Sequence, residues 1–170
     1  VGMHQAGKVD DEYLRELENV ACPSAGSCGG QFTANTMATV SEAIGLALPG
    51  SAGAPAPYET RDEYAVASGR QVMDLIQSNL RPRDIVTRRA LENAATVVAA
   101  SGGSTNAALH LPAIAHECGI EFDLHDVAEI FKRTPYIADM KPGGKYVAKD
   151  MFDVGGVPVL MKALLQSGHL

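Results

Sequence analysis

The stretch TRRALENAATVVAASGGSTN, residues 87–106, combines a helix pattern with a glycine turn. Thr87 belongs to a residue type that caps helix N-termini, because its hydroxyl can accept a hydrogen bond from a free backbone N–H group. Apolar residues follow at helical spacing on one face: Leu91, Ala94, Ala95 and Val98. The sequence Ser101-Gly102-Gly103-Ser104 then breaks the periodicity. The stretch therefore predicts a helix with one inward face that ends in a tight turn.

The same kind of pattern predicts helices on both sides of this stretch. The turn leads into a helix from Asn106 to His116, with Gly119 as its C-terminal cap. Other helices are expected at residues 10–20, 31–46, 60–80, 123–131 and 157–166. Thr60 and Glu63 have the spacing of a capping box. In the helix that they would begin, residues three and four apart are expected to face inward: Tyr64, Ala65, Ser68, Val72, Leu75, Ile76 and Leu80. The best strand candidate is the short segment 135–140.

These elements add up to a mostly α chain. Aromatic residues make up 5% of the sequence and Trp is absent, a composition that favours close helix packing over a β-sandwich. No linker is long enough to divide two domains, so residues 1–170 are expected to form a single, partial domain. The pattern is equally compatible with the helical layer of a larger α/β domain whose strands lie outside this chain.

Charge and composition argue against several classes of partner. The net charge of −6 argues against nucleic acid, because phosphate binding needs clustered Lys and Arg. No apolar run approaches the roughly 18 residues that a membrane span needs, and the first residues do not resemble a signal peptide. The three cysteines form no regular framework, so reduced thiols in a cytoplasmic protein are expected. Cys118 is expected in the core, whereas one of the others could bind a metal.

The segment richest in reactive side chains is CPSAGSCGGQFTANTM, residues 22–37. Its second thiol, Cys28, is expected immediately before a helix N-terminus, where free amides and the helix dipole favour the thiolate that binds metals. Gly29 and Gly30 let backbone N–H groups approach the sulfur. Alternatively, Cys22 and Cys28 are small buried residues in a tight turn, since their spacing is not a standard zinc spacing.

Two further turns carry polar residues. The turn at residues 101–106 can bind a carboxylate or phosphate on its N–H groups. The alternative there is a helix cap formed by Ser104 or Thr105. The segment DMKPGGK, residues 139–145, resembles a loop that presents Lys to an anion, but it lacks the spacing of a P-loop, and a solvated turn is the alternative.

Taken together, these motifs resemble the dihydroxy-acid dehydratases of the IlvD/Edd dehydratase family. The CGG-x-x-TANTM block within residues 22–37 is the most specific of them. The resemblance continues in order through EAIGLALPGSA (42–52), RDIVTRRALENA (83–94), GGSTNAALHLPAIAHE (102–117), DMKPGGKYV (139–147) and GGVPVLMKALL (155–165). The sugar-acid and phosphogluconate dehydratases of the same superfamily lack the TANTM run, so the branch that acts in valine and isoleucine biosynthesis is expected.

The resemblance implies a hydro-lyase that converts a 2,3-dihydroxy-3-methyl carboxylic acid to a 2-keto acid. It implies an iron–sulfur cluster, of the 2Fe–2S rather than the 4Fe–4S type, held by three cysteines, with Mg²⁺ as a second metal. One iron would act as a Lewis acid on the C3 hydroxyl. Cys28 matches the cluster ligand that precedes Gly-Gly, whereas Cys22 matches a cysteine that is not a ligand. Polar residues of the matched motifs are expected to line the substrate site: Thr33, Asn35, Ser104, Thr105 and Asn106.

Several parts of the family's site have no counterpart in this sequence. These are the Cys-Asp-Lys segment, another cluster cysteine, a later Glu metal ligand and the Ser base, so the Mg²⁺ ligands and the catalytic base are expected outside the chain. Family members are several times longer and usually homodimers. The chain is therefore expected to be the helical part of an α/β N-terminal domain, inactive without the rest of the protein. A sugar-acid dehydratase and a non-catalytic helical metal-binding or interaction module are the alternatives.

Overall fold

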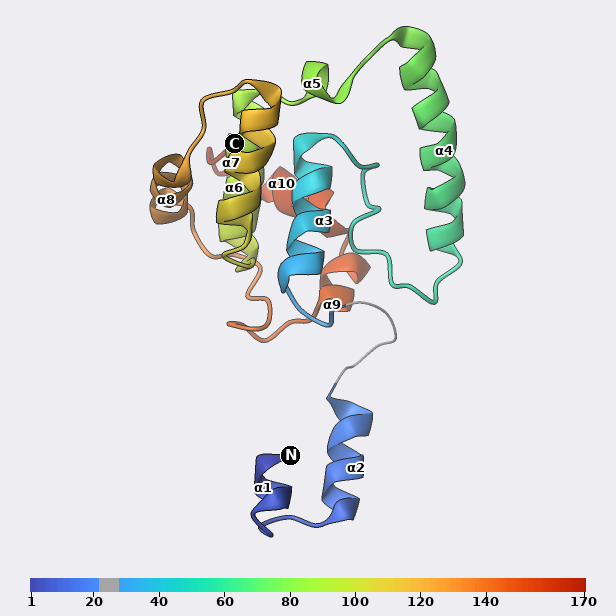
Figure 1. Ribbon diagram of the computed structural model, residues 1–170, viewed down its shortest axis with the longest axis vertical. Coiled ribbons are helices and arrows are strands. Elements are labelled where there is room, and N and C mark those ends of the chain that lie inside the picture. The colour runs from blue at the N-terminus through green and yellow to red at the C-terminus, as the bar shows by residue number, and fades with distance from the viewer. Residues whose placement is uncertain (22–27) are drawn as a thin grey trace.

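The computed structural model describes residues 1–21 and 28–170, and helices dominate it (Figure 1). Their bounds are α1 (Gly2–Gln5), α2 (Asp11–Val20), α3 (Thr33–Ile44), α4 (Thr60–Ser78), α5 (Pro82–Ile85), α6 (Arg88–Ser101), α7 (Ala107–Cys118), α8 (Leu124–Arg133), α9 (Ala148–Asp153) and α10 (Gly156–Gln166). Within the two described ranges the backbone forms no strand beyond an isolated bridge between Met140 and Tyr146. The prediction of a mostly α chain is confirmed.

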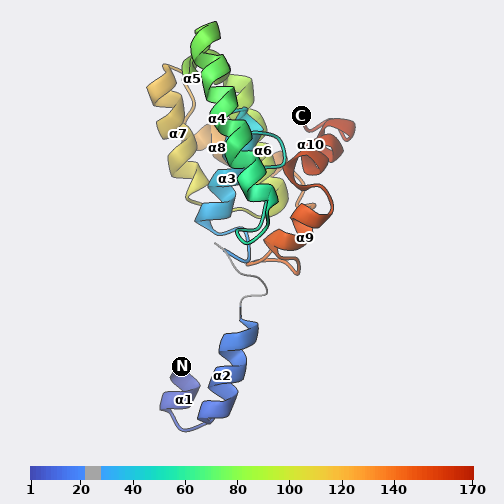
Figure 2. The ribbon, with the colours of Figure 1, turned by 90° about the vertical axis from the view of Figure 1, so that its right-hand side faces the viewer.

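Helix α6 lies at the centre of the helical body and is its most buried element. Thr87 caps it as predicted, with its hydroxyl accepting a hydrogen bond of 3.1 Å from the amide of Ala90. The side chains on its inner face are at most 1% exposed: Leu91, Ala94, Ala95, Val97, Val98 and Ala100. Because most of them are small, α3, α7, α8 and α10 can all pack closely around one axis (Figure 2).

A buried carboxylate fixes the loop that follows α3. Val40, Ala43 and Ile44 of this helix are buried in one core cluster with the inner face of α6. Glu42 is 8% exposed, and its two carboxylate oxygens accept hydrogen bonds from the amides of Gly50 (2.6 Å) and Ala52 (3.0 Å). Since a buried charge is tolerated only when it is hydrogen-bonded, Glu42 ties the irregular loop to the core.

Helix α8 is held on α6 by its own capping residues. Asp123 and Asp126 form the capping box that begins α8. Arg88, in the first turn of α6, pairs with Asp126 at 2.6 Å and lies over the ring of Phe122. The amide of Asp123 and the guanidinium of Arg88 together lower the pKa of Asp126 below its ordinary value. The cap and the interhelical ion pair thus share one carboxylate.

Three local predictions are wrong. Residues 135–140 form no strand, because the amides of Ile137 and Ala138 both donate to the carbonyl of Ala100 at the end of α6. Thr60 does not cap a helix: Glu59 occupies the N-cap position, and the hydroxyl of Thr60 is buried without a hydrogen-bond partner in the described part of the chain. The expected helices at 31–46 and 60–80 are shorter, and end in left-handed residues at Gly45 and Asn79.

Helix α4 lies at the outer edge of the molecule, with its predicted inner stripe largely exposed (Figure 1). Tyr64 and Leu75 are half-buried, but Val72 is 52% exposed and Ile76 is 67% exposed. Exposed apolar stripes of this length are typical of surfaces that another element covers. No described helix is both long and apolar enough to cross a membrane.

We therefore expect the isolated 170-residue chain to self-associate through α4. Replacing Val72 and Ile76 together with Gln should lower the weight-average mass in sedimentation equilibrium, because it removes apolar area from the stripe. Leu109→Gln, at a single exposed apolar position of α7, is the control and should leave association unchanged. A monodisperse monomer for the unmodified chain would contradict the prediction.

Candidate functional site

The 139–145 turn lies beside residues 28–31, the described part of the cysteine loop, although more than 100 residues separate the two segments. The amide of Gln31 donates to the carbonyl of Lys141 at 2.7 Å, and the amide of Ala148 donates to the carbonyl of Gly29 at 2.8 Å. Gly30 allows this approach, since a Cβ there would lie 2.7 Å from the carbonyl oxygen of Lys141. The backbone that follows Cys28 is therefore fixed against the turn that precedes α9.

The start of α3 contacts the turn between α6 and α7 through hydroxyl groups. The hydroxyl of Thr36 accepts a hydrogen bond from the amide of Ser104 (2.9 Å) and donates to the carbonyl of Gln31 (3.2 Å). Thr33 accepts from the side-chain amide of Asn106 at 2.6 Å and lies 3.4 Å from the hydroxyl of Ser104. The structure thus brings together three of the five residues predicted to line a substrate site: Thr33, Ser104 and Asn106.

Asn35 connects α3 to the cysteine loop. Its side-chain amide nitrogen lies 2.7 Å from the carbonyl oxygens of both Cys28 and Gly30, and donates to each. Another predicted residue, Thr105, is exposed. The polar face of α3 is therefore explained in large part by contacts within the chain.

Cys28 is a half-buried free thiol. Helix α3 begins at Thr33, so four residues separate the cysteine from the helix, and the expectation that it lies immediately before the N-terminus is wrong. Cys22 lies outside the described residues. No group of three or more metal-binding side chains occurs among the described residues. The donor set fits one thiolate ligand to a cluster whose other ligands come from elsewhere.

The two other predicted turns do not present a preformed anion site. The amides of Gly102, Gly103 and Ser104 donate to Ala99, Val98 and Thr36, and that of Asn106 donates to the hydroxyl of Ser104. These donors are engaged within the chain. The alternative, a helix cap formed by Ser104 or Thr105, is wrong as well, because Asn106 is the N-cap residue of α7 and has no side-chain cap hydrogen bond, while the hydroxyl of Ser104 accepts from the amide of Asn106 itself. Lys141 and Lys145 are exposed, as expected for a solvated turn.

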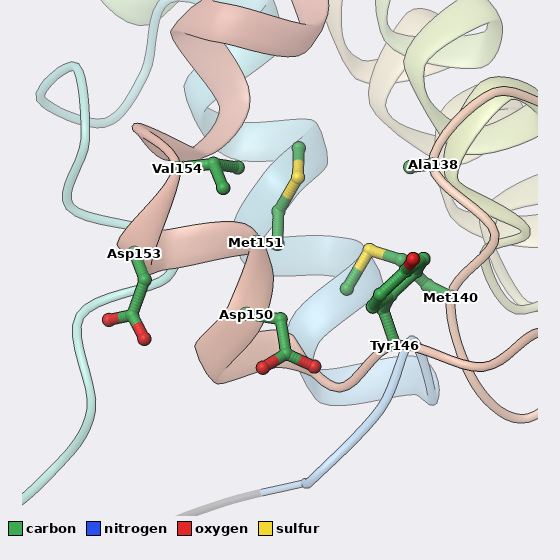
Figure 3. Close-up of a pocket in the computed structure, with 7 residues that line it drawn as sticks. All are labelled: Ala138, Met140, Tyr146, Asp150, Met151, Asp153 and Val154. Carbon is green, nitrogen blue, oxygen red and sulfur yellow. The ribbon is translucent and has the colours of Figure 1, made fainter.

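Sequence reasoning missed the cavity beside the cysteine loop, which has a volume of about 500 Å³. Its lining comes from the 138–146 segment and α9: Ala138, Met140, Tyr146, Asp150, Met151, Asp153 and Val154 (Figure 3). Both acids have partners, because Asp150 accepts from the amide of Val147 and Asp153 pairs with Lys149. The sequence feature that could have indicated this cavity is the Met-rich and aromatic composition around the glycine turn.

Tyr136 packs against the 139–145 turn and is hydrogen-bonded to its backbone. Its hydroxyl donates to the carbonyl of Met140 at 2.9 Å, and a Cβ at Gly144 would lie 2.5 Å from the same hydroxyl and 2.1 Å from the carbonyl oxygen of Asp139. Desolvation and then the charge of Asp139 raise the pKa of Tyr136 above its ordinary value. The close packing at Gly144 explains why a glycine is needed in this turn.

We expect Thr36→Val to lower the free energy of unfolding by about 1–3 kcal/mol, because the partly buried amide of Ser104 loses its acceptor. Thr96→Val is the matched control: Thr96 is 3% exposed, but its hydroxyl donates only to the carbonyl of Glu92 within α6. Urea denaturation of the isolated chain at low concentration measures both. Equal losses in the two variants would mean that the contact between α3 and the 101–106 turn contributes nothing specific.

Comparison with known proteins extends these observations. The chain is 76% identical to "Dihydroxy-acid dehydratase 2" of Bradyrhizobium diazoefficiens, 73% identical to the dihydroxy-acid dehydratase of Parvibaculum lavamentivorans and 72% identical to that of Pelagibacter ubique. Each match covers the whole chain and 30% of the relative, so the chain spans about a third of the length of these proteins. The family model for the dihydroxy-acid/6-phosphogluconate dehydratase N-terminal region matches residues 1–170. The chain belongs to this dehydratase family.

Proposed function

We propose that this chain is part of a dihydroxy-acid dehydratase, a hydro-lyase that converts 2,3-dihydroxy-3-methyl carboxylic acids to 2-keto acids. The observation that carries the proposal is the position of Cys28. Its loop is held by Asn35 on one side and by Lys141 and Ala148 on the other, as a metal ligand requires. The high identity to proteins named as dihydroxy-acid dehydratases supports this branch over a sugar-acid dehydratase.

Cys28 would provide one of three thiolates for an iron–sulfur cluster, which we propose to be 2Fe–2S. When bound, such a cluster supplies an open iron that acts as a Lewis acid toward a hydroxyl leaving group. The remaining cluster ligands, the Mg²⁺ ligands and the base that removes the C2 proton would come from the part of the protein beyond this chain. The described residues thus contribute to the architecture of the site rather than to proton transfer.

The residues of this chain suited to substrate binding lie at the junction of α3 and the 101–106 turn. Thr33, Ser104 and Asn106 form a hydrogen-bonded group that links the two elements. Hydroxyl and amide groups of this kind can exchange partners with the carboxylate and hydroxyl oxygens of a dihydroxy acid. Thr105 would contribute at the edge of the same region, whereas the side-chain amide of Asn35 is directed at the carbonyls of Cys28 and Gly30.

The remaining features of the proposal concern the whole protein. We propose that it acts in the cytoplasm, in branched-chain amino acid biosynthesis, as a homodimer. The exposed stripe of α4 is consistent with a chain that normally contacts further protein. A small-molecule dihydroxy acid is the substrate.

In the full-length enzyme, we expect Cys28→Ser to abolish the visible absorption of the cluster and nearly all turnover. Cys22→Ser should retain the cluster and cost at most about 1–2 kcal/mol of stability, as for a small thiol made polar. Cys118→Ser, at a half-buried position against the core, is a second control and should retain the cluster. Full activity of Cys28→Ser would overturn the proposed mechanism, and equal iron loss in Cys22→Ser would show that the ligand set is wider.

The isolated chain, reconstituted with iron and sulfide, is expected to have no dehydratase activity, because it carries one proposed cluster ligand and no proposed base. The full-length protein should form a keto acid from 2,3-dihydroxyisovalerate and turn over an aldonate poorly, as a coupled keto-acid assay would measure. A preference for the aldonate would favour the sugar-acid dehydratase. Keto-acid formation by the isolated chain would contradict the assignment of the missing groups.

A further inference from the structure

The side chain of Asn35 holds two carbonyl groups on either side of Gly29. Its Nδ2 atom lies 2.7 Å from the carbonyl oxygen of Cys28 and 2.7 Å from that of Gly30. A side-chain amide has two N–H donors, and their number matches these two acceptors. Because Asn35 lies in the first turn of α3, the bridge connects the loop to a helix that is anchored in the core.

The backbone bonds to the neighbouring turn act at different atoms. They hold the carbonyl of Gly29, through Ala148, and the amide of Gln31, through Lys141. The carbonyl of Cys28 is held by Asn35. Glycines at positions 29 and 30 leave this stretch with wide conformational freedom in the absence of such contacts. The orientation of the peptide group between Cys28 and Gly29 therefore depends on the side-chain amide of Asn35.

We propose that Asn35 is a positioning residue for Cys28: by bridging the carbonyls of Cys28 and Gly30, it orients the thiolate toward the cluster. This inference rests on the proposed function and assigns Asn35 a structural task at the metal rather than a contact with substrate. Groups that orient a metal ligand from outside the coordination sphere typically change metal affinity by about 10- to 100-fold when they are removed.

Two variants of the full-length enzyme test the proposal. Asn35→Asp keeps the shape of the side chain but replaces the two donors with an oxygen that repels both carbonyls, and Asn35→Ala removes the bridge. Ser41→Ala is the matched control, because Ser41 lies on the same helix and its hydroxyl bonds only the carbonyl of Met37 at 2.8 Å. Far-UV circular dichroism and the unfolding temperature verify that each variant is folded.

The first measurement uses the reconstituted enzyme. We expect both Asn35 variants to lose iron to a chelator about 10- to 100-fold faster than the unmodified enzyme, with altered visible circular dichroism bands of the cluster. Ser41→Ala should behave as the unmodified enzyme. A change in the cluster spectrum reports the ligand geometry itself, which a general loss of stability would not alter in a folded protein.

The second measurement uses the metal-free enzyme, so that it does not depend on cluster binding. The rate at which iodoacetamide alkylates Cys28, followed by peptide mass spectrometry, should change in the Asn35 variants, while that of Cys118 stays constant. Unchanged alkylation, iron loss and spectrum in folded Asn35→Asp would overturn the proposal. If the unmodified enzyme binds no cluster, the proposed function fails and this role fails with it, while the alkylation rates still report separately whether Asn35 holds the loop.

Discussion

The hydroxyl of Thr36 joins the two parts of the chain on which the site depends. It accepts from the amide of Ser104, 68 residues away, and donates to the carbonyl of Gln31 in the cysteine loop. One buried hydroxyl thus fixes the α6–α7 turn and the start of α3 relative to each other. Leaving either partner unpaired in the core would cost free energy, so the contact constrains both turns at once. The loop that carries Cys28 and the group around Asn106 take their relative positions from it.

The elements that could be predicted from the sequence are those whose determinants are local. Thr87 caps α6 as expected, α8 begins within one residue of the expected start at 123, and the inward face of α6 follows from apolar spacing. Segment 135–140 shows the limit of this reasoning. Its aromatic and β-branched residues are typical of a strand, yet its amides cap the carbonyl of Ala100, because the nearest free acceptor is a helix end. Nothing in the local pattern indicates which acceptor will be near.

The candidate site could be predicted only in part, for a related reason. Residue types and spacing identify Cys28, the 101–106 turn and the 139–145 turn as separate segments. Their convergence comes from contacts between residues about 70 to 120 positions apart, which no local period encodes. Only the structure shows that the amides of the 101–106 turn are engaged within the chain and that Asn35 holds two carbonyl groups. The polar side chains of α3 have partners within the chain itself, which the sequence pattern alone does not identify.

Helix α4 and the loop at Cys28 both have features that further protein would complete: an exposed apolar stripe in the first and a single metal-binding thiol in the second. The stripe around Val72 and Ile76 is exposed although its pattern is that of a buried face. Cys28 is held at its carbonyl by Asn35, although no group of three or more metal-binding side chains occurs among the described residues. Apolar area left in water and an ordered but incomplete ligand set both cost free energy unless further protein completes them. Since the related proteins are about three times as long, both features are explained if the completing surfaces belong to the rest of such a protein. The α3–α6 core would then serve as a rigid base that keeps one cluster ligand in register with the ligands contributed from outside it.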